Sequence, residues 1–156
     1  MKFKIVAVGK IKENCFREAI AEYVKRISRF ATTEIAEVDE CTFCGVPNAS
    51  EIEKILQTEG QSILQKAEGC IVALDIDGEQ LTSVQLSDRL EKFTQRFSTI
   101  TFVIGGSYGL SQQVKQRANL RLSFGKITLP HQLCRVVLCE QIYRACAIRN
   151  NVPYHK

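Results

Sequence analysis

The chain has 156 residues, enough for one domain that buries roughly two-thirds of the surface of its unfolded chain. Apolar residues make up 45% and charged residues 24%, and no run of about 18 apolar residues is present that would span a membrane. The opening segment MKFKIVAVGKIKENC has an apolar core too short for a signal peptide. We therefore expect a cytoplasmic protein in which most of the seven cysteines are reduced.

The charge is unevenly distributed along the chain. Residues 107–156 carry eight lysines and arginines and one acid, Glu140, whereas residues 1–106 carry 13 basic and 16 acidic residues. A cationic third beside a slightly acidic remainder indicates a polyanionic partner, nucleic acid above all. A solvated helix surface explains the same charge equally well, so the charge alone leaves both interpretations open.

In the first third of the chain, apolar spacing alternates between strand and helix periods. The expected elements are a strand at 3–8, a helix at 14–30, a strand at 34–38, a loop at 39–49 and a helix from 50 to about 67. Ser50 and Glu53 match a capping box, a pattern that opens helices.

The same alternation continues to the end of the chain. The expected elements are a strand at 71–76, a helix capped by Ser83, a strand at 100–104, a helix from Ser111 to about Leu120, a strand-like piece up to Pro130 and a helix from about Gln132 to Arg149. The apolar runs at 71–76 and 100–104 are typical of strands covered on both faces. The sequence therefore predicts an α/β fold, with a mainly parallel sheet and helices on both faces.

Three loops follow predicted strands and are candidate ligand sites, because ligands bind beyond the carboxyl ends of parallel strands. They are Asp75–Gly78, Gly105–Gly109 and Thr128–His131. The second has the form G-G-x-x-G, in which glycines let the backbone approach a ligand. It differs from the dinucleotide fingerprint G-x-G-x-x-G, and an ordinary tight turn explains it as well as a binding site does.

Other polar motifs carry less weight. Cys41 and Cys44 form a C-x-x-C pair, but zinc would need two more ligands and a redox site would need an adjacent helix start. A lone histidine such as His131 is usually structural. Tyr154 and His155 follow a proline at the chain terminus, which suggests an end docked against something rather than a frayed tail.

The segments ITFVIGGSYGLS, LSFGKITLPHQLCRVVLCEQIYRACAI and VPYHK, in this order and spacing, resemble the SPOUT-class methyltransferases. More closely, the chain is similar to the small bacterial family that methylates N3 of a pseudouridine in large-subunit ribosomal RNA. The resemblance covers the whole chain, including KIVAVGKIKE and REAIAEYVKRI. It implies a single SPOUT domain over 1–156, with a carboxyl-terminal trefoil knot and the cofactor site in about 100–156. Ordinary rules for connecting strands make such a knot rare.

The resemblance also implies a cofactor, partners and site residues. S-adenosylmethionine would bind in the knot, no metal would be needed, and a homodimer would complete the active site on ribosomal RNA, in the ribosome or the large subunit. The cofactor contacts carried over by motif are Leu74, Gly105, Phe124, Gly125, Lys126, Ile127, Thr128 and Leu129. Methyl transfer is a direct displacement, so catalysis depends on aligning the nucleophile with the sulfonium methyl group.

Within this family reading, the carboxyl-terminal residues are the candidate catalytic groups. The imide N3 must lose its proton, and arginine cannot accept it because it is charged at any workable pH. His155 is therefore the expected base, and Tyr154 would position the target base or stack on it. Arg135 and Arg144 would hold phosphates or stabilise the anionic base.

A dimer is also expected from the wide apolar surface of the helix at 132–149. Its apolar residues are Leu133, Val136, Val137, Leu138, Ile142, Tyr143, Cys146 and Ile148. Two other functions remain open. A non-catalytic, ribosome-associated RNA-binding protein of the same fold would keep the basic segment without cofactor affinity. A Rossmann-like nucleotide-binding enzyme is disfavoured by the missing fingerprint.

Overall fold

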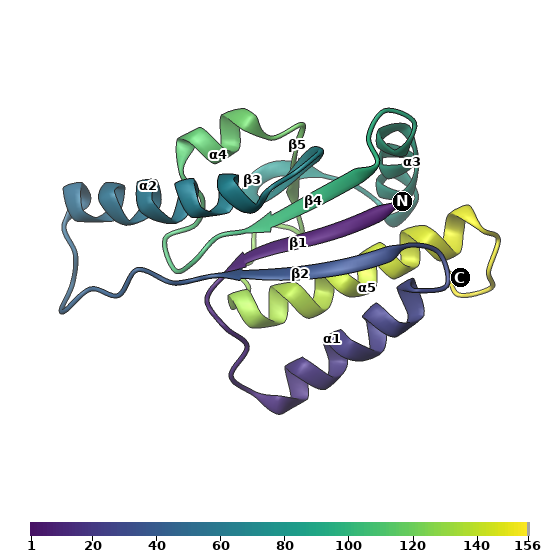
Figure 1. Cartoon of the computed structure of the whole chain (residues 1–156), viewed down its shortest axis with the longest axis horizontal. Helices are drawn as coiled ribbons and strands as arrows, with labels where there is room; N and C mark the ends of the chain where they lie inside the picture. The colour runs from purple at the N-terminus through teal and green to yellow at the C-terminus, as the bar shows by residue number, and fades with distance from the viewer. Residues whose placement is uncertain (156) are drawn as a thin grey trace.

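The structure, a computed structural model, describes residues 1–155, so Lys156 of the basic segment lies outside the described residues. Strands and helices alternate along it as β1 (Lys2–Val8), α1 (Asn14–Ile27), β2 (Thr32–Val38), α2 (Ala49–Lys66), β3 (Cys70–Gln80), α3 (Ser83–Thr94), β4 (Thr99–Ile104), α4 (Gln112–Arg117), β5 (Leu120–Ser123) and α5 (His131–Arg149). The strands form one sheet in the order β2-β1-β4-β3-β5, and all paired neighbours are parallel (Figure 1). The predicted α/β architecture is confirmed.

Two apolar layers cover the two faces of the sheet, because successive side chains of a strand point to opposite faces. In β1, Phe3, Ile5 and Ala7 join the cluster that packs under α1, α3 and α5. Val6 and Val8 join the cluster under α2 and α4. Both faces of the central strands are therefore dry, which accounts for their uninterrupted apolar runs. Among the described residues no helix is both long and apolar enough to cross a membrane.

Two predicted helix starts are wrong by one or two residues. The capping box of α2 is formed by Asn48 and Glu51 rather than by Ser50 and Glu53. Asn48 has the extended backbone that a cap needs, while position 50 already lies within the helix. For the same reason α3 is capped by Thr82, not by Ser83.

The strand-like piece predicted up to Pro130 is also corrected. β5 ends at Ser123, and residues 124–130 form a loop. The Ser123 hydroxyl donates to the carbonyl of Ile76 at 3.0 Å, which fixes the start of this loop beside β3. The apolar residues of the loop line a cavity instead of pairing with a strand. Their sequence therefore resembles that of a buried strand, although the loop makes no strand hydrogen bonds.

The path after β5 takes the 124–130 loop along the carboxyl ends of the strands. β5 is an edge strand reached from α4, which lies on the α2 face of the sheet. The chain then passes the carboxyl ends of β3 and β4 and enters α5 on the opposite face (Figure 1). Such a crossing departs from ordinary connection rules. It is the crossing expected of the trefoil-knot class.

Substitution at Gly60 of α2 tests how closely this helix packs on the segment before α4. A β-carbon at Gly60 would overlap the hydroxyl of Ser111, the cap of α4. We expect Gly60→Leu to lower the free energy of unfolding by about 1–3 kcal/mol, because overpacking forces side chains and backbone apart. Denaturant unfolding measures this change. Gln61→Leu, which places the same side chain at an exposed position, is the control, and equal losses in the two variants would contradict the packing argument.

Candidate functional site

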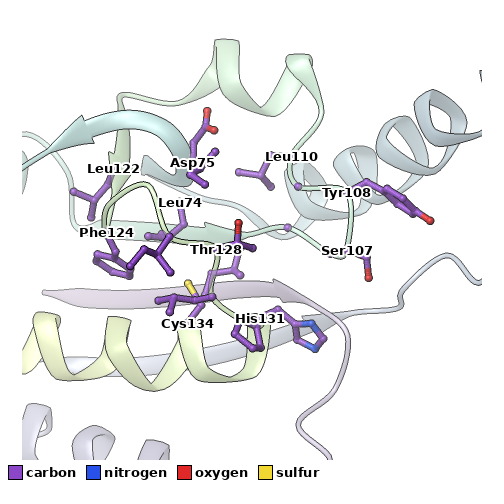
Figure 2. A pocket seen from close by; sticks show the side chains of 18 of the residues that line it. Leu74, Asp75, Ser107, Tyr108, Leu110, Leu122, Phe124, Thr128, His131 and Cys134 are labelled. Carbon is purple, nitrogen blue, oxygen red and sulfur yellow. The ribbon is translucent and has the colours of Figure 1, made fainter. Parts of the chain in front are cut away.

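A cavity of about 750 Å³ opens at the carboxyl ends of β3 and β4 (Figure 2). Its walls come from three segments: Leu74–Ile76 after the buried part of β3, Ile104–Leu110 after β4, and the 124–130 loop with the start of α5. The three loops expected from the sequence therefore meet at one place. One wall falls outside the range 100–156, because β3 contributes residues from much earlier in the chain.

Seven of the eight predicted cofactor residues line this cavity. Leu74 and Phe124 lie at one end of it, and Thr128 lies nearer the other end (Figure 2). Lys126 is the exception: it is exposed and is not among the residues that line the cavity. Only the backbone of Lys126, and not its side chain, is placed to contact a ligand in this cavity.

The glycine loop is a tight turn that also forms one wall of the cavity. The Gly109 N–H donates to the Gly106 carbonyl at 3.1 Å, and Gly109 has a φ of 84°, a conformation that favours glycine. A β-carbon at Gly105 would overlap the Gly109 carbonyl. The two interpretations of this motif are thus compatible, since the turn closes on itself while it presents its backbone to the cavity.

Asp75 anchors the β3 wall by charge. Its side chain is almost fully buried and accepts from Arg121 at 2.7 Å and from Lys115 at 3.2 Å. Burial pushes the pKa of Asp75 upward, but the hydrogen bonds from Arg121 and Lys115 outweigh it and hold the pKa below 3.8. Asp75 is therefore an ionised group that ties β3 to β5 and α4. Two of the basic residues of the cationic segment are used in this way.

A second buried carboxylate, Glu59 of α2, lies behind the glycine loop and was missed by the sequence reasoning. Glu59 is 3% exposed; its Oε1 accepts from the backbone N–H of Cys41 at 2.9 Å, and its Oε2 has no partner among the described residues. A β-carbon at Gly106 would lie 3.0 Å from that Oε2. The sequence did contain a sign of its burial: Glu59 lies four residues after Ile55 and four before Ile63, on the apolar stripe of the helix.

The carboxyl-terminal residues form a docked end, as expected, but far from the cavity. Tyr154 packs on Tyr143 with a centroid distance of 4.7 Å, and its hydroxyl donates to Glu140 at 3.1 Å. Arg144 donates to Glu140 at 2.6 Å, and its Nη1 lies 3.3 Å from Nδ1 of the exposed His155. Burial, together with the Glu140 carboxylate, raises the pKa of Tyr154 to about 12, so its hydroxyl keeps its proton.

Arg135, predicted to contact phosphate or the target base, lies elsewhere. It is 1% exposed and forms an ion pair with Glu37 at 2.9 Å, and it donates to the carbonyls of Val8 and Gly9. These bonds fasten the start of α5 to the carboxyl ends of β1 and β2. The guanidinium is committed to the fold and presents nothing to a phosphate in this subunit.

His131, which the sequence reasoning treated as an ordinary structural residue, lines the cavity. It is the first residue of α5 and lies with Ser107 and Tyr108 at one end of the cavity (Figure 2). A signal was present in the sequence: His131 directly follows Pro130 in one of the three candidate loops.

The cysteine pair shows no sign of a metal site. All seven cysteines are free, with Cys41 partly buried and Cys44 exposed. Within residues 1–155, no group of three or more histidine, cysteine, aspartate or glutamate side chains is arranged to hold a metal ion. Three of the cysteines, Cys70, Cys139 and Cys146, are buried and belong to the apolar core.

Comparisons with known proteins agree on one family. The family model described as "Predicted SPOUT methyltransferase" matches residues 1–155. The protein named Ribosomal RNA large subunit methyltransferase H from Streptococcus pneumoniae (strain CGSP14) is 51% identical, with 100% of both chains covered. The protein of the same name from S. pneumoniae serotype 4 (strain ATCC BAA-334 / TIGR4) has the same identity and coverage.

Solved structures share the fold at low sequence identity. A probable methylase family protein from Haemophilus influenzae Rd KW20 matches with a TM-score of 0.53 and 11% identity, over 99% of this chain and 70% of that one. A putative methyltransferase from Legionella pneumophila, determined with bound SAM, matches with a TM-score of 0.50 and 10% identity, over 93% of this chain and 66% of that one. These likenesses concern the fold alone.

The buried Glu59 predicts a pH-dependent stability. Burial raises the pKa of Glu59 above its ordinary value of 4.5, and Glu40 adds to the rise, while the Cys41 N–H opposes it. The folded chain therefore prefers the protonated carboxyl, and the stability due to this group is lost as the pH rises through the raised pKa. We expect Glu59→Gln to gain stability relative to the wild type as the pH increases above 4.5.

Denaturant unfolding at a series of pH values measures this gain. Glu53→Gln, at an exposed position of the same helix, is the matched control and should show no such trend. A difference between Glu59→Gln and the wild type that does not vary with pH would contradict the argument.

Proposed function

The chain belongs to the SPOUT methyltransferase family, and from this premise we propose that the cavity at the carboxyl ends of β3 and β4 is its methyl-transfer site. The protein is an S-adenosylmethionine-dependent methyltransferase of large-subunit ribosomal RNA. The observation that supports the location is that loops from three distant parts of the chain converge there. We further propose that residues 1–156 act as one domain and that the protein works in the cytoplasm.

The lining suits a cofactor with an adenine and a methionine moiety. The 124–129 segment offers backbone N–H and C=O groups beside mostly apolar side chains, and such groups can satisfy the adenine edges without charged residues. Gly105 lets the backbone of the opposite wall come close. Bound there, S-adenosylmethionine supplies an electrophilic methyl group, and the protein's task is to hold the nucleophile in line with it.

We propose N3 of a pseudouridine as the methyl acceptor. A nitrogen flanked by two carbonyls is a weak acid and becomes a nucleophile only when it loses its proton. The site therefore needs a base and a donor that stabilises the negative charge. The cavity wall carries one imidazole, His131, and the docked end carries the other, His155.

The separation of these groups supports a homodimer. α5 runs from the cavity at His131 to the docked end near Arg144, about 20 Å at 1.5 Å per residue. The end folds back only as far as Glu140, so it cannot reach the cavity of its own subunit. We propose that a partner subunit supplies Tyr154, His155 and Arg144 to this cavity, in a symmetric dimer.

The wide apolar surface that the sequence predicts for α5 is only partly available to a partner subunit. Leu138 and Ile142 are fully buried within the subunit, by the sheet and by α1 and α3. Leu133, Val136 and Val137 remain half-exposed and are available to a partner. The roles proposed for the docked end are then distinct: His155 accepts the N3 proton, Tyr154 positions the target base or stacks on it, and Arg144 stabilises the anionic base.

Substitution at Gly105 tests the cofactor site. Because Gly105→Val would push the 105–109 turn open at the cavity wall, we expect S-adenosylmethionine affinity to fall by at least tenfold, about 1.4 kcal/mol. Isothermal titration with S-adenosylmethionine measures it. Gln113→Val, which adds the same side chain at an exposed position of α4, should bind normally. Unchanged affinity in Gly105→Val would remove the cavity as the cofactor site, and no affinity in the wild type would favour a non-catalytic RNA-binding protein.

Substitution at His155 tests the base. We expect His155→Ala to lower the single-turnover rate of methyl transfer by roughly 100-fold or more, with little change in cofactor affinity. The loss should shrink as the pH rises, because the target base then ionises unaided. A full rate would eliminate His155 as the base, and a loss independent of pH would leave it a positioning role.

Mixing the two variants tests the exchange between subunits. In a mixed dimer of Gly105→Val and His155→Ala, one cavity is intact and faces an intact end, so activity should reappear on mixing. If each subunit completed its own site, the mixture would stay inactive.

A further inference from the structure

His131 lines the cavity but is not among the predicted cofactor contacts. In Figure 2, Leu74 and Phe124 lie at one end of the cavity, and His131 lies at the other with Ser107 and Tyr108. The predicted cofactor contacts include Leu74 and Phe124 at the first end and Thr128 nearer the second, and they leave His131 without a role. Neither ring nitrogen of His131 forms a hydrogen bond with any other residue in the described part of the chain, so the side chain is available to a ligand.

The position of this imidazole is set by the fold. Arg135, one helical turn further along α5, holds the helix to Glu37 at 2.9 Å and to the carbonyl of Val8 at 3.0 Å. The adjacent Gln132 accepts from the backbone N–H of Lys12 at 2.9 Å. The first turn of α5 is therefore fixed to the carboxyl end of β1. A buried, paired group such as Arg135 holds a neighbouring side chain more precisely than a free loop does.

Gly9 gives the ring its place. A β-carbon at Gly9 would lie 3.2 Å from His131 Nε2 and 3.8 Å from Glu40 Oε2, and Gly9 has a φ of 82°. Any other residue at position 9 would be strained and would crowd the imidazole. The glycine at the end of β1 thus leaves room for the ring at the mouth of the cavity.

We propose that His131 donates a hydrogen bond to a carbonyl oxygen of the target base, an inference that rests on the proposed function. A uracil-type ring has a carbonyl on each side of N3, and loss of the N3 proton places negative charge on those oxygens. A neutral imidazole has one N–H to donate and an imidazolium has two, so the role holds in either form. The amino end of α5 adds its own partial positive charge beside the ring.

The transfer step balances with His131 unchanged. The N3 proton passes to the general base, the N3–methyl bond forms as the sulfur–methyl bond breaks, and the electron pair of that bond stays on sulfur. His131 keeps its proton and stabilises the carbonyl oxygens while the N3 charge is present. A donor aimed at a developing oxyanion is worth about 10²–10³ in rate.

Single-turnover methyl transfer to ribosomal RNA, at saturating S-adenosylmethionine, tests the assignment. We expect His131→Ala to lose about 100-fold in rate while cofactor affinity in titration changes by less than about threefold. His131→Gln, which retains an N–H donor, should recover at least about tenfold of that loss. Gln113→Ala, at an exposed position of α4 that is not part of the cavity wall, is the control and should stay near the wild-type rate.

Each other outcome overturns the inference in a recognisable way. A full rate in His131→Ala shows that His131 does not contact the substrate. A fall in cofactor affinity as large as the fall in rate makes it part of the cofactor pocket. Equal losses in His131→Ala and Gln113→Ala, or no recovery in His131→Gln, indicate general damage to the fold or a role other than donation. Failure of the wild type to methylate ribosomal RNA would instead overturn the proposed function.

Discussion

The fold depends on one passage of the chain, from the edge strand β5 to α5 beneath β1 on the other face of the sheet. All five strands are parallel, so their carboxyl ends lie along one edge, and the 124–130 loop must run along that edge to reach α5. The loop cannot pair with a strand there, and its backbone is left facing a cavity. The cavity is thus a direct result of the connection.

Buried charges secure the passage at its two ends and behind it. Asp75 holds β3 to the strand from which the loop departs, and Arg135 holds the helix at which it arrives. Leaving either charge without its partner inside the protein would cost several kcal/mol, since a buried ion must be paired to be tolerated. Glu59 differs because one of its oxygens has no partner among the described residues, and its burial behind the glycine loop raises the pKa of its carboxyl group.

Much of this arrangement could be read from apolar periodicity. The alternation of strands and helices predicted the sheet class, and the rule that ligands bind beyond parallel strands located the three loops. What periodicity does not report is hydrogen bonding. The 124–130 loop looked like a strand because its residues are apolar. Ser50 and Ser83 matched the capping pattern, but so did the nearby Asn48 and Thr82, which are the caps in the structure. Burial of Arg135 was not predicted for a related reason, because its ion pair depends on Glu37, which is far away in sequence. The place of Glu59 on the apolar stripe of α2 could have indicated its burial, but not its bond to the distant Cys41 N–H.

The order of strands in the sheet has a consequence for how the chain acquires its shape. β1 is an interior strand, and on one side it pairs with β4, so that Lys2 lies opposite Thr99. Two-thirds of the chain must therefore be made before this strand finds its second neighbour, and the passage beneath it must follow. Contacts so distant in sequence slow folding, because the entropy of closing a long loop is lost before any contact compensates for it. The edge of β1 that β4 later occupies stays unpaired for that whole interval, and an unpaired strand edge of this kind is prone to aggregate.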